Sequence, residues 1–250
     1  MITINDITIF GIRPYIFFSG CAFFLGFVIL IHLLKDHYYE YAALPKLILW
    51  EISSVVCFGV ATGYIIEVVK NLFIIKKIKL IGFNGVGFVA YGGIIGALII
   101  ARIFIKRFGM NKSIIMDSLS CTIPIIHGIA RIGCLFAGCC YGREYYGFMS
   151  IFYPKLNLHC FPTQIIEACL NITLGLLLIY LKKKRFFKGT IVYFYLVIYA
   201  VYRFILEFFR GDEVRGIFGA FSTSQYISII VFGFAVVKLI LYYRRIKMYD

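Results

Sequence analysis

Two arginines and one glutamate recur at helical spacing at the end of an apolar segment. Arg203, Glu207 and Arg210 are four and then three residues apart, so a helix places them on one face. The three side chains carry a net positive charge, and guanidinium groups bind phosphate oxygens in a forked, bidentate geometry. Alone, the pattern fits an anion site and a buried ion pair between helices equally well. A further arginine, Arg131, makes phosphate binding the better interpretation.

The segment from His127 to Arg143 places polar residues and glycines in an otherwise apolar region. A charge at membrane depth costs roughly 2.5–3.5 kcal/mol, so we expect Arg131 to have a partner or a functional role. The glycines allow a backbone or a ligand to come close. His127 lies one helical turn before Arg131, which predicts that both share a face. We interpret this segment as the chemical centre.

Three cysteines of the central segment allow several interpretations: Cys134, Cys139 and Cys140. With His127, or with His159 and Cys160, they could supply zinc ligands. Their spacing is not typical of a structural zinc site, so the sequence predicts no metal and favours plain packing of small side chains. A disulfide and a reactive thiolate stay open as alternatives.

Membrane helices must position these groups. The chain has 250 residues, of which 62% are hydrophobic and 15% charged, and its mean hydropathy is +0.90. Several apolar windows reach about 20 residues, the length that crosses a bilayer. The sequence predicts an all-α, polytopic integral membrane protein with a single domain over residues 1–250. The net charge of +14 does not indicate nucleic-acid binding, because the basic residues cluster in short loops that contact membrane lipids.

We expect about seven transmembrane helices. They cover approximately residues 15–34, 47–69, 83–105, 114–136, 164–181, 191–209 and 224–243. With the N-terminus outside, the inner loops hold more lysine and arginine than the outer segments, although a lysine-rich loop follows the second span. The balance predicts an N-out/C-in orientation with a small extracytoplasmic segment at about 138–163. The central segment and residues 210–222 then face the outer leaflet.

Further candidate residues lie in the third and fifth spans. Paired glycines, Gly92 and Gly93, allow a lipid or a neighbouring helix to approach, and helix packing is the more common explanation. Tyr91, directly before them, could donate a hydrogen bond. Glu167 lies in the first turns of the fifth span, where it could compensate the helix dipole or orient a nearby guanidinium.

Five motifs follow one another along the chain. They are Gly92-Gly93-Ile-Ile-Gly96; Ala130-Arg131-Ile-Gly133 with Gly138, Gly142 and Arg143; Pro162-Thr163-Gln164-Ile-Ile-Glu167; Tyr202-Arg203-Phe with Glu207-Phe-Phe-Arg210; and Ser224-Gln225-Tyr-Ile-Ser228. In order and spacing they resemble the prolipoprotein diacylglyceryl transferases of bacterial plasma membranes, over approximately residues 11–245. The resemblance implies transfer of the diacylglyceryl group from phosphatidylglycerol to the lipobox cysteine thiol of a prolipoprotein signal peptide. A thioether forms, glycerol phosphate leaves, and no cofactor is needed.

The resemblance also implies roles for individual residues. Arg131 and Arg210, which match arginines of the family, are expected to act in catalysis. His127, one helical turn before Arg131, and Tyr91, directly before the paired glycines, are added as catalytic candidates from their positions in this chain. The residues expected to bind substrate are Gly92, Gly93, Arg143, Gln164, Glu167, Arg203, Glu207 and Gln225. The seven-span, N-out topology of a multi-pass plasma-membrane protein is implied as well.

The chain departs from the family pattern at several positions. Tyr91 stands where the family commonly has histidine, Ser19 where it has tyrosine, and Cys134, Ala137 and Cys139 where it has asparagines and a glutamate. We favour the same reaction with another proton acceptor, such as His127. The alternatives are a paralogue that uses the same lipid donor with a different acceptor, and a non-catalytic protein that binds lipid or a partner.

Overall fold

The computed structural model describes residues 2–3, 9–70, 90–184, 187, 189–212 and 217–247. Its described part contains seven helices: α1 (Pro14–Leu34), α2 (Tyr38–Lys70), α3 (Ala90–Arg107), α4 (Lys112–Phe136), α5 (Thr163–Lys183), α6 (Ile191–Glu207) and α7 (Thr223–Lys247). Five short strands connect them: β1 (Ile2–Thr3), β2 (Ile151–Tyr153), β3 (Leu158–Cys160), β4 (Ile217–Phe218) and β5 (Phe221–Ser222). The prediction of an all-α polytopic membrane protein is confirmed.

Five of these helices are long and apolar enough to cross a membrane. The candidate spans are Pro14–Leu34, Ala42–Ile65, Lys112–Phe136, Thr163–Lys183 and Thr223–Arg245. The outer faces of these helices carry large apolar side chains, such as Phe24 and Ile230, each 70% exposed, as a lipid-facing surface requires. Helix α6 has 17 residues and extends about 26 Å, slightly less than the hydrocarbon thickness.

The third span can be compared with its prediction only from Ala90 onward. It was expected from residue 83, whereas α3 begins at Ala90 and residues 83–89 lie outside the described part of the chain. Helix α3 also carries Lys106 and Arg107 in its last turn, so its apolar length is short.

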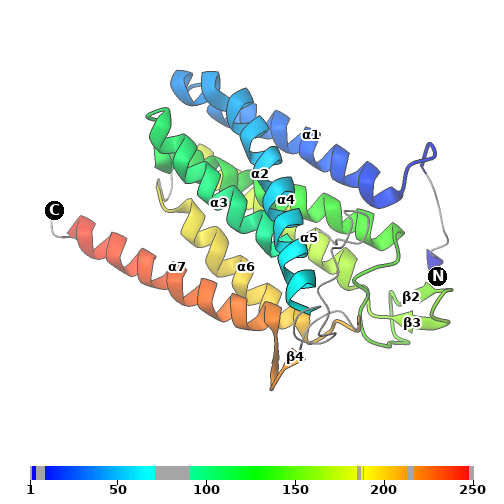
Figure 1. Ribbon diagram of the computed structural model, residues 1–250. Helices are drawn as coiled ribbons and strands as arrows, with labels where there is room; N and C mark the ends of the chain where they lie inside the picture. The colour runs from blue at the N-terminus through cyan, green and yellow to red at the C-terminus, as the bar shows by residue number, and fades with distance from the viewer. Residues whose placement is uncertain are drawn as a thin grey trace. The chain divides into compact units, whose positions relative to one another are not determined.

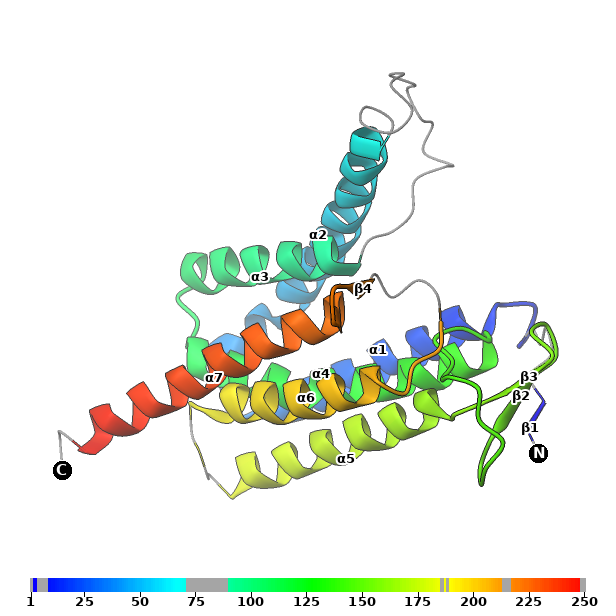
Figure 2. The same ribbon diagram turned by 90° about the horizontal axis from the view of Figure 1, so that it is seen from below.

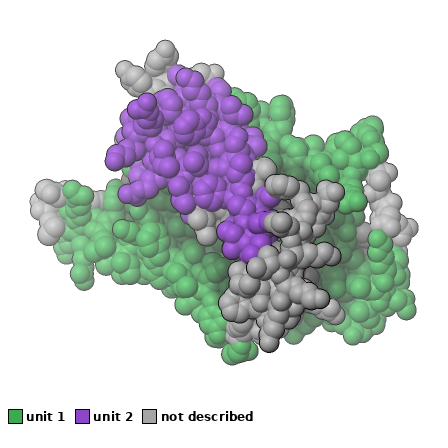
Figure 3. All heavy atoms as spheres, in the orientation of Figure 1, with its two compact units in different colours: residues 1–33, 113–250 green, residues 34–112 purple. Residues whose placement is uncertain are grey.

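The chain is divided into two compact units (Figure 3). The first unit comprises residues 1–33 and 113–250, and the second comprises residues 34–112. The second unit is formed by α2 and α3, which pack closely because Gly96 leaves room for the ring of Phe58. The ring of Trp50 meets Phe104 edge to face. The single domain expected over residues 1–250 stays a prediction.

In the first unit, glycines bring α4 close to α5. A Cβ at Gly128 would lie 2.9 Å from the carbonyl oxygen of Ala168, and one at Gly175 would lie 3.2 Å from that of Cys121. Small residues at such contacts are what membrane helices use to approach one another, because their backbones can then touch. Gly128 follows His127, and Ala168 follows Glu167, so this contact sets the distance between two predicted site residues.

The helices α1, α4, α5, α6 and α7 run along a common direction in both views (Figures 1 and 2). At one end lies a small sheet in the order β1-β2-β3, in which β1 pairs parallel with β2 and β2 pairs antiparallel with β3. The pairing of Ile2 with Ile151 places the N-terminal strand on the same side of the bundle as the segment 138–163. The C-terminus lies at the opposite end (Figure 1). The expected orientation, with this sheet outside the cell, stays a prediction.

Helix α7 begins with a capping box. The backbone N–H of Ser222 donates to Oε1 of Gln225 at 2.9 Å, and the N–H of Gln225 donates back to Oγ of Ser222 at 3.3 Å. Reciprocal bonds of this kind satisfy N–H groups that a helix leaves open at its first turn. The start of α7 is held beside the end of α6 by other bonds, from Arg203 to Oγ of Ser224 and from Nε2 of Gln225 to the carbonyl of Phe204.

Candidate functional site

Glu167 holds two predicted site residues together. Its Oε2 lies 3.0 Å from Nε of Arg131, and its Oε1 lies 3.6 Å from Nε2 of His127. The side chain of Glu167 is only 4% exposed. Removing either partner of the ion pair with Arg131 would therefore leave an uncompensated charge at a buried position. Glu167 therefore lies beside a guanidinium, and its role in orienting Arg131 stays a prediction.

A second charged group lies where α6 ends and α7 begins. Nη2 of Arg203 lies 2.8 Å from Oε2 of Glu207 and donates to Oγ of Ser224 at 3.1 Å. Nη1 of Arg210 lies 4.0 Å from the same oxygen of Glu207. Arg210 also donates to both carboxylate oxygens of Asp212, with Nε at 2.8 Å from Oδ1. Burial lowers the pKa of Arg210, but Asp212 outweighs it and the pKa is raised, so this guanidinium stays charged.

Neutral hydrogen bonds connect the two charged groups. The hydroxyl of Tyr202 donates to Oδ1 of Asn171 at 2.7 Å, and Nδ2 of Asn171 donates to the backbone carbonyl of Glu167 at 2.8 Å. Because Tyr202 directly precedes Arg203, these bonds fix the arginine-bearing end of α6 relative to Glu167 on α5.

The charges of the site balance. The arginines Arg131, Arg203 and Arg210 are paired with the carboxylates Glu167, Glu207 and Asp212, respectively. The net positive charge of Arg203, Glu207 and Arg210 is thus neutralised by Asp212, a residue that the expectation did not include. A guanidinium has five N–H donors, and each carboxylate engages only some of them. Nη1 of Arg203 is buried and has no hydrogen-bond partner within the described part of the chain, so it remains available to an oxyanion.

The three cysteines of the central segment converge. The Sγ atoms of Cys134, Cys139 and Cys140 lie within 4.8 Å of one another, and Nη1 of Arg131 lies 3.9 Å from Sγ of Cys134. His127, His159 and Cys160 do not belong to this group. Hydrogen bonds from Cys134 and Cys139, and then the charges of Arg131 and Arg210, lower the pKa of the Cys140 thiol.

Gln164 supports the turn that carries these cysteines. Its Nε2 donates to the carbonyl of Cys139 at 2.7 Å and to the hydroxyl of Tyr153 at 2.8 Å. Burial raises the pKa of Tyr153, which keeps the phenol protonated. Gln164 is 1% exposed, and its described contacts position the cysteine-bearing turn.

Arg143 and Gln225 lie at the edge of the site. The guanidinium of Arg143 is exposed and lies 5.1 Å from the ring centre of Phe209, as in a cation–π contact. The amide of Gln225 takes part in the capping box of α7, and its Nε2 is 3.4 Å from the carbonyl of Phe204. Substrate binding by either residue stays a prediction.

Tyr91, Gly92 and Gly93 lie in the first turn of α3, and their side-chain environment is outside what the structure describes. Their predicted roles are therefore untested.

Four polar residues of the site were not predicted: Asn171, Tyr202, Asp212 and Ser224. A signal was present for Asp212, an acid two residues after Arg210 and just beyond the helix end. Asn171 lies four residues after Glu167, a spacing that places both on one face of α5 and could have indicated it. Tyr202 and Ser224 stand within two of the motifs, but the sequence analysis gave them no role of their own.

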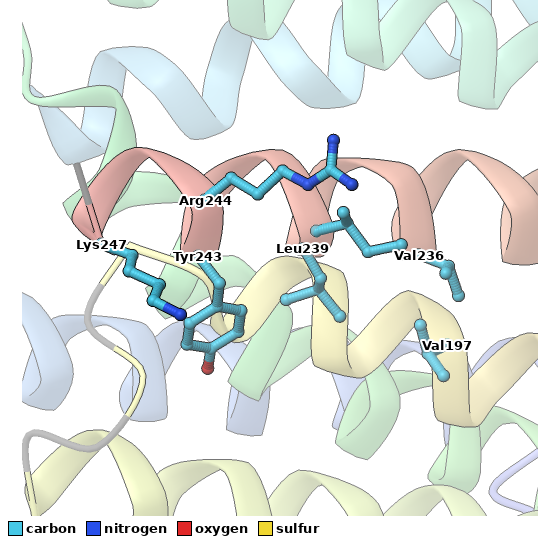
Figure 4. A pocket seen from close by; sticks show the side chains of 7 residues that line it. Val197, Val236, Leu239, Tyr243, Arg244 and Lys247 are labelled. Atoms are coloured by element: carbon cyan, nitrogen blue, oxygen red, sulfur yellow. The ribbon is translucent and has the colours of Figure 1, made fainter.

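A cavity of about 430 Å³ lies elsewhere, between α6 and α7 (Figure 4). It is lined by Val197 and by residues from the second half of α7, including Tyr243, Arg244 and Lys247. None of the candidate residues lines it. The charged groups described above, and not this cavity, form the candidate site.

Comparisons with known proteins identify the family of the chain. A family model described as prolipoprotein diacylglyceryl transferase matches residues 3–241. The phosphatidylglycerol–prolipoprotein diacylglyceryl transferase 2 of Clostridium perfringens is 40% identical over 156 residues, and the alignment covers 59% of each chain. The corresponding transferase of Clostridium tetani is 36% identical over 184 residues, 70% of this chain and 72% of its own. That of Finegoldia magna is 26% identical over 231 residues, 90% and 89% of the two chains.

Proposed function

The chain belongs to the prolipoprotein diacylglyceryl transferase family, and on this premise we propose that it transfers the diacylglyceryl group of phosphatidylglycerol to the lipobox cysteine of a prolipoprotein. The observation that carries the proposal is a set of three arginines, Arg203 buried and Arg131 and Arg210 partly buried, each paired with a carboxylate at one end of the helices α4 to α7. The protein acts in the plasma membrane, with this end facing the outer leaflet.

The arginines suit the phosphodiester of phosphatidylglycerol. Their carboxylate partners fix the direction of each guanidinium, and donors such as Nη1 of Arg203 remain for phosphate oxygens. Donors held in place before the reaction stabilise the charge that develops on a leaving group without reorganising during it. Arg131 and Arg210 take the catalytic roles, and Arg203 with Glu207 binds the lipid headgroup.

The reaction is an alkylation of sulfur. The acceptor Sγ attacks the glyceryl carbon that carries the phosphate, a carbon–sulfur bond forms, and the carbon–oxygen bond breaks. Its electron pair stays on the phosphate oxygen, which ends as glycerol phosphate carrying the thiol proton. His127, 26% exposed and 3.6 Å from Glu167, is placed to pass this proton on. In the first turn of α3, Tyr91 assists proton transfer, and Gly92 and Gly93 admit the lipid.

The deciding experiment measures the thioether product from labelled phosphatidylglycerol and a lipobox peptide. Arg131→Lys keeps a positive charge beside Glu167 but removes the forked donor set, so the protein is expected to fold and to lose about 100-fold or more in rate. Arg245→Lys, an exposed position near the C-terminal end of α7, is the matched control and is expected to keep the wild-type rate.

Three results would contradict parts of the proposal. Wild-type turnover in Arg131→Lys would exclude the phosphate role of Arg131. Release of glycerol phosphate without peptide modification would indicate a different acceptor, and lipid binding without any turnover would indicate a non-catalytic protein.

A further inference from the structure

Three thiols from two parts of the chain meet beside Arg131. Cys134 lies in the last turn of α4, and Cys139 and Cys140 lie in the turn that follows it. Within the described part of the chain, this is the one group of at least three metal-ligating side chains whose ligand atoms lie this close together. The sequence spacing alone favoured packing, because it does not show that the turn folds back onto α4.

The sulfur positions fit a metal ion. Zinc binds thiolate sulfur at about 2.3 Å, which holds three sulfurs of a tetrahedral site about 3.8 Å apart. From a separation of at most 4.8 Å, each sulfur has to move by about 0.6 Å or less to reach that geometry. Side-chain rotation is enough for such a shift.

The surrounding residues hold the thiols in this arrangement. Oγ1 of Thr163 donates to the carbonyl of Cys140 at 3.0 Å, and Nε2 of Gln164 donates to that of Cys139 at 2.7 Å. The guanidinium of Arg131 donates toward Sγ of Cys134. Donors to ligand sulfurs and fixed ligand backbones are what supports the ligands of a metal site in other proteins.

The cluster supplies three ligands and is open on one side. Cys134 is buried, Cys140 is partly buried and Cys139 is exposed. Structural zinc sites use four protein ligands, whereas catalytic sites use three and leave a position for water or substrate. The three-thiol cluster therefore has the number of protein ligands found in catalytic zinc sites.

We propose that Cys134, Cys139 and Cys140 bind a thiophilic metal ion of the zinc class, whose open position takes the thiol of the acceptor cysteine. The inference rests on the proposed function, because a lipobox thiol is the ligand it assigns to that position. It also gives Cys134 and Cys139 a role at positions where the chain departs from the family pattern of asparagines and a glutamate.

The step balances without any further reactant. The acceptor thiol ionises as it coordinates, because a metal-bound thiol loses its proton. Its sulfur attacks the glyceryl carbon, the carbon–oxygen bond to phosphate breaks, and the proton ends on the released glycerol phosphate. The metal returns to its three protein ligands when the thioether, a weaker ligand, leaves.

Metal content is the first test. Protein purified under reducing conditions is expected to hold one zinc ion per chain, and Cys139→Ser or Cys140→Ser to lose it. Cys169→Ser changes an exposed cysteine of α5 and is expected to keep it. Removing the metal with a thiophilic chelator is expected to slow the transfer about 100-fold, the size of a general base's contribution, and zinc to restore it.

A spectroscopic test asks whether the acceptor thiol binds the metal. Wild-type protein loaded with Co²⁺ is expected to show sulfur-to-metal charge-transfer absorption that changes when the lipobox peptide is added. A peptide with serine in place of the lipobox cysteine is expected to leave the spectrum unchanged. This measurement needs no variant of the protein, so misfolding of a cysteine variant does not affect it.

The outcomes separate the two proposals. Wild-type protein that transfers diacylglyceryl groups but takes up neither zinc nor Co²⁺, or that holds these cysteines as a disulfide, overturns the metal site and leaves the transferase intact. A metal site whose absorption spectrum does not change when the cysteine peptide is added overturns the role of the metal in binding the acceptor thiol. If the spectrum responds to the peptide but no lipid is transferred, the proposed function fails and the site stands.

Discussion

Replacing Gly128 with alanine tests whether the contact between α4 and α5 sets the geometry of the site. The added Cβ would lie 2.9 Å from the carbonyl oxygen of Ala168 and 2.7 Å from Cγ1 of Ile172. Ordinary contacts begin at 3.4 Å. The side chain of Ile172 can rotate away, but the backbone oxygen cannot. The two helices must therefore separate by about 0.5 Å at this point.

The separation acts directly on the ion pair. Gly128 lies between His127 and Arg131 on α4, and Ala168 is next to Glu167 on α5. The distance of 3.0 Å between Nε of Arg131 and Oε2 of Glu167 would grow to roughly 3.5 Å, which weakens the ion pair and displaces the guanidinium. A displacement of 1 Å at a reacting group can lower the rate about 100-fold, so a displacement of about 0.5 Å is expected to lower the rate about tenfold. Overpacking is expected to lower the free energy of unfolding by about 1–3 kcal/mol.

The assay compares initial rates of thioether formation and thermal stability in detergent for Gly128→Ala and Gly233→Ala. Gly233 lies in α7 with no atom within 4 Å of its Cβ position, so alanine there is expected to leave the rate unchanged. It is also expected to stabilise the helix by up to about 1 kcal/mol. A wild-type rate and stability in Gly128→Ala, or equal losses in both variants, would refute the reasoning.

Two further predictions concern Asp212 and the orientation of the chain. Asp212→Asn replaces the charged acceptor of Arg210 with a neutral amide, so part of a charge-assisted pair of hydrogen bonds is lost. The protein is expected to stay folded, and its kcat/KM is expected to fall about tenfold, which corresponds to about 1.4 kcal/mol of transition-state stabilisation. An unchanged kcat/KM would show that Asp212 does not position Arg210. An epitope inserted after Lys155, in the exposed turn between β2 and β3, is expected to be digested by protease added to intact spheroplasts, whereas one attached after Asp250 is protected until the cells are lysed. The opposite pattern would contradict the N-out orientation.

Helical spacing predicted the parts of the site that lie within one helix. Arg203 and Glu207, four residues apart, form an ion pair at 2.8 Å, and the placement of Glu167 in the first turns of α5 led to its role as a partner for a guanidinium. The apolar windows gave the positions of most helices, because burial in lipid leaves the backbone no alternative to hydrogen-bonding within each span.

The parts that depend on the chain reversing direction were not predictable. The cysteine cluster exists because the chain turns back after α4, through left-handed conformations at Gly138 (φ +67°) and Cys140 (φ +58°). Glycine is suited to such a conformation, but a cysteine gives no sign of it in the sequence. Asp212 lies beyond the end of α6, where helical periodicity no longer relates it to Arg210.

The balance of charge bears on how the site recognises a lipid. With three arginines and three carboxylates, attraction between net charges cannot select phosphatidylglycerol from other anionic lipids or hold it strongly. Recognition depends instead on the orientation of the donors. The carboxylates orient the guanidiniums, and Nη1 of Arg203 is buried without a protein acceptor in the described structure. A phosphate that fills these donors satisfies groups that are unfavourable when left unpaired, and this gain does not depend on net charge. The same arrangement avoids the cost of three uncompensated positive charges at membrane depth, which explains why a site for an anion is built with as many acids as bases.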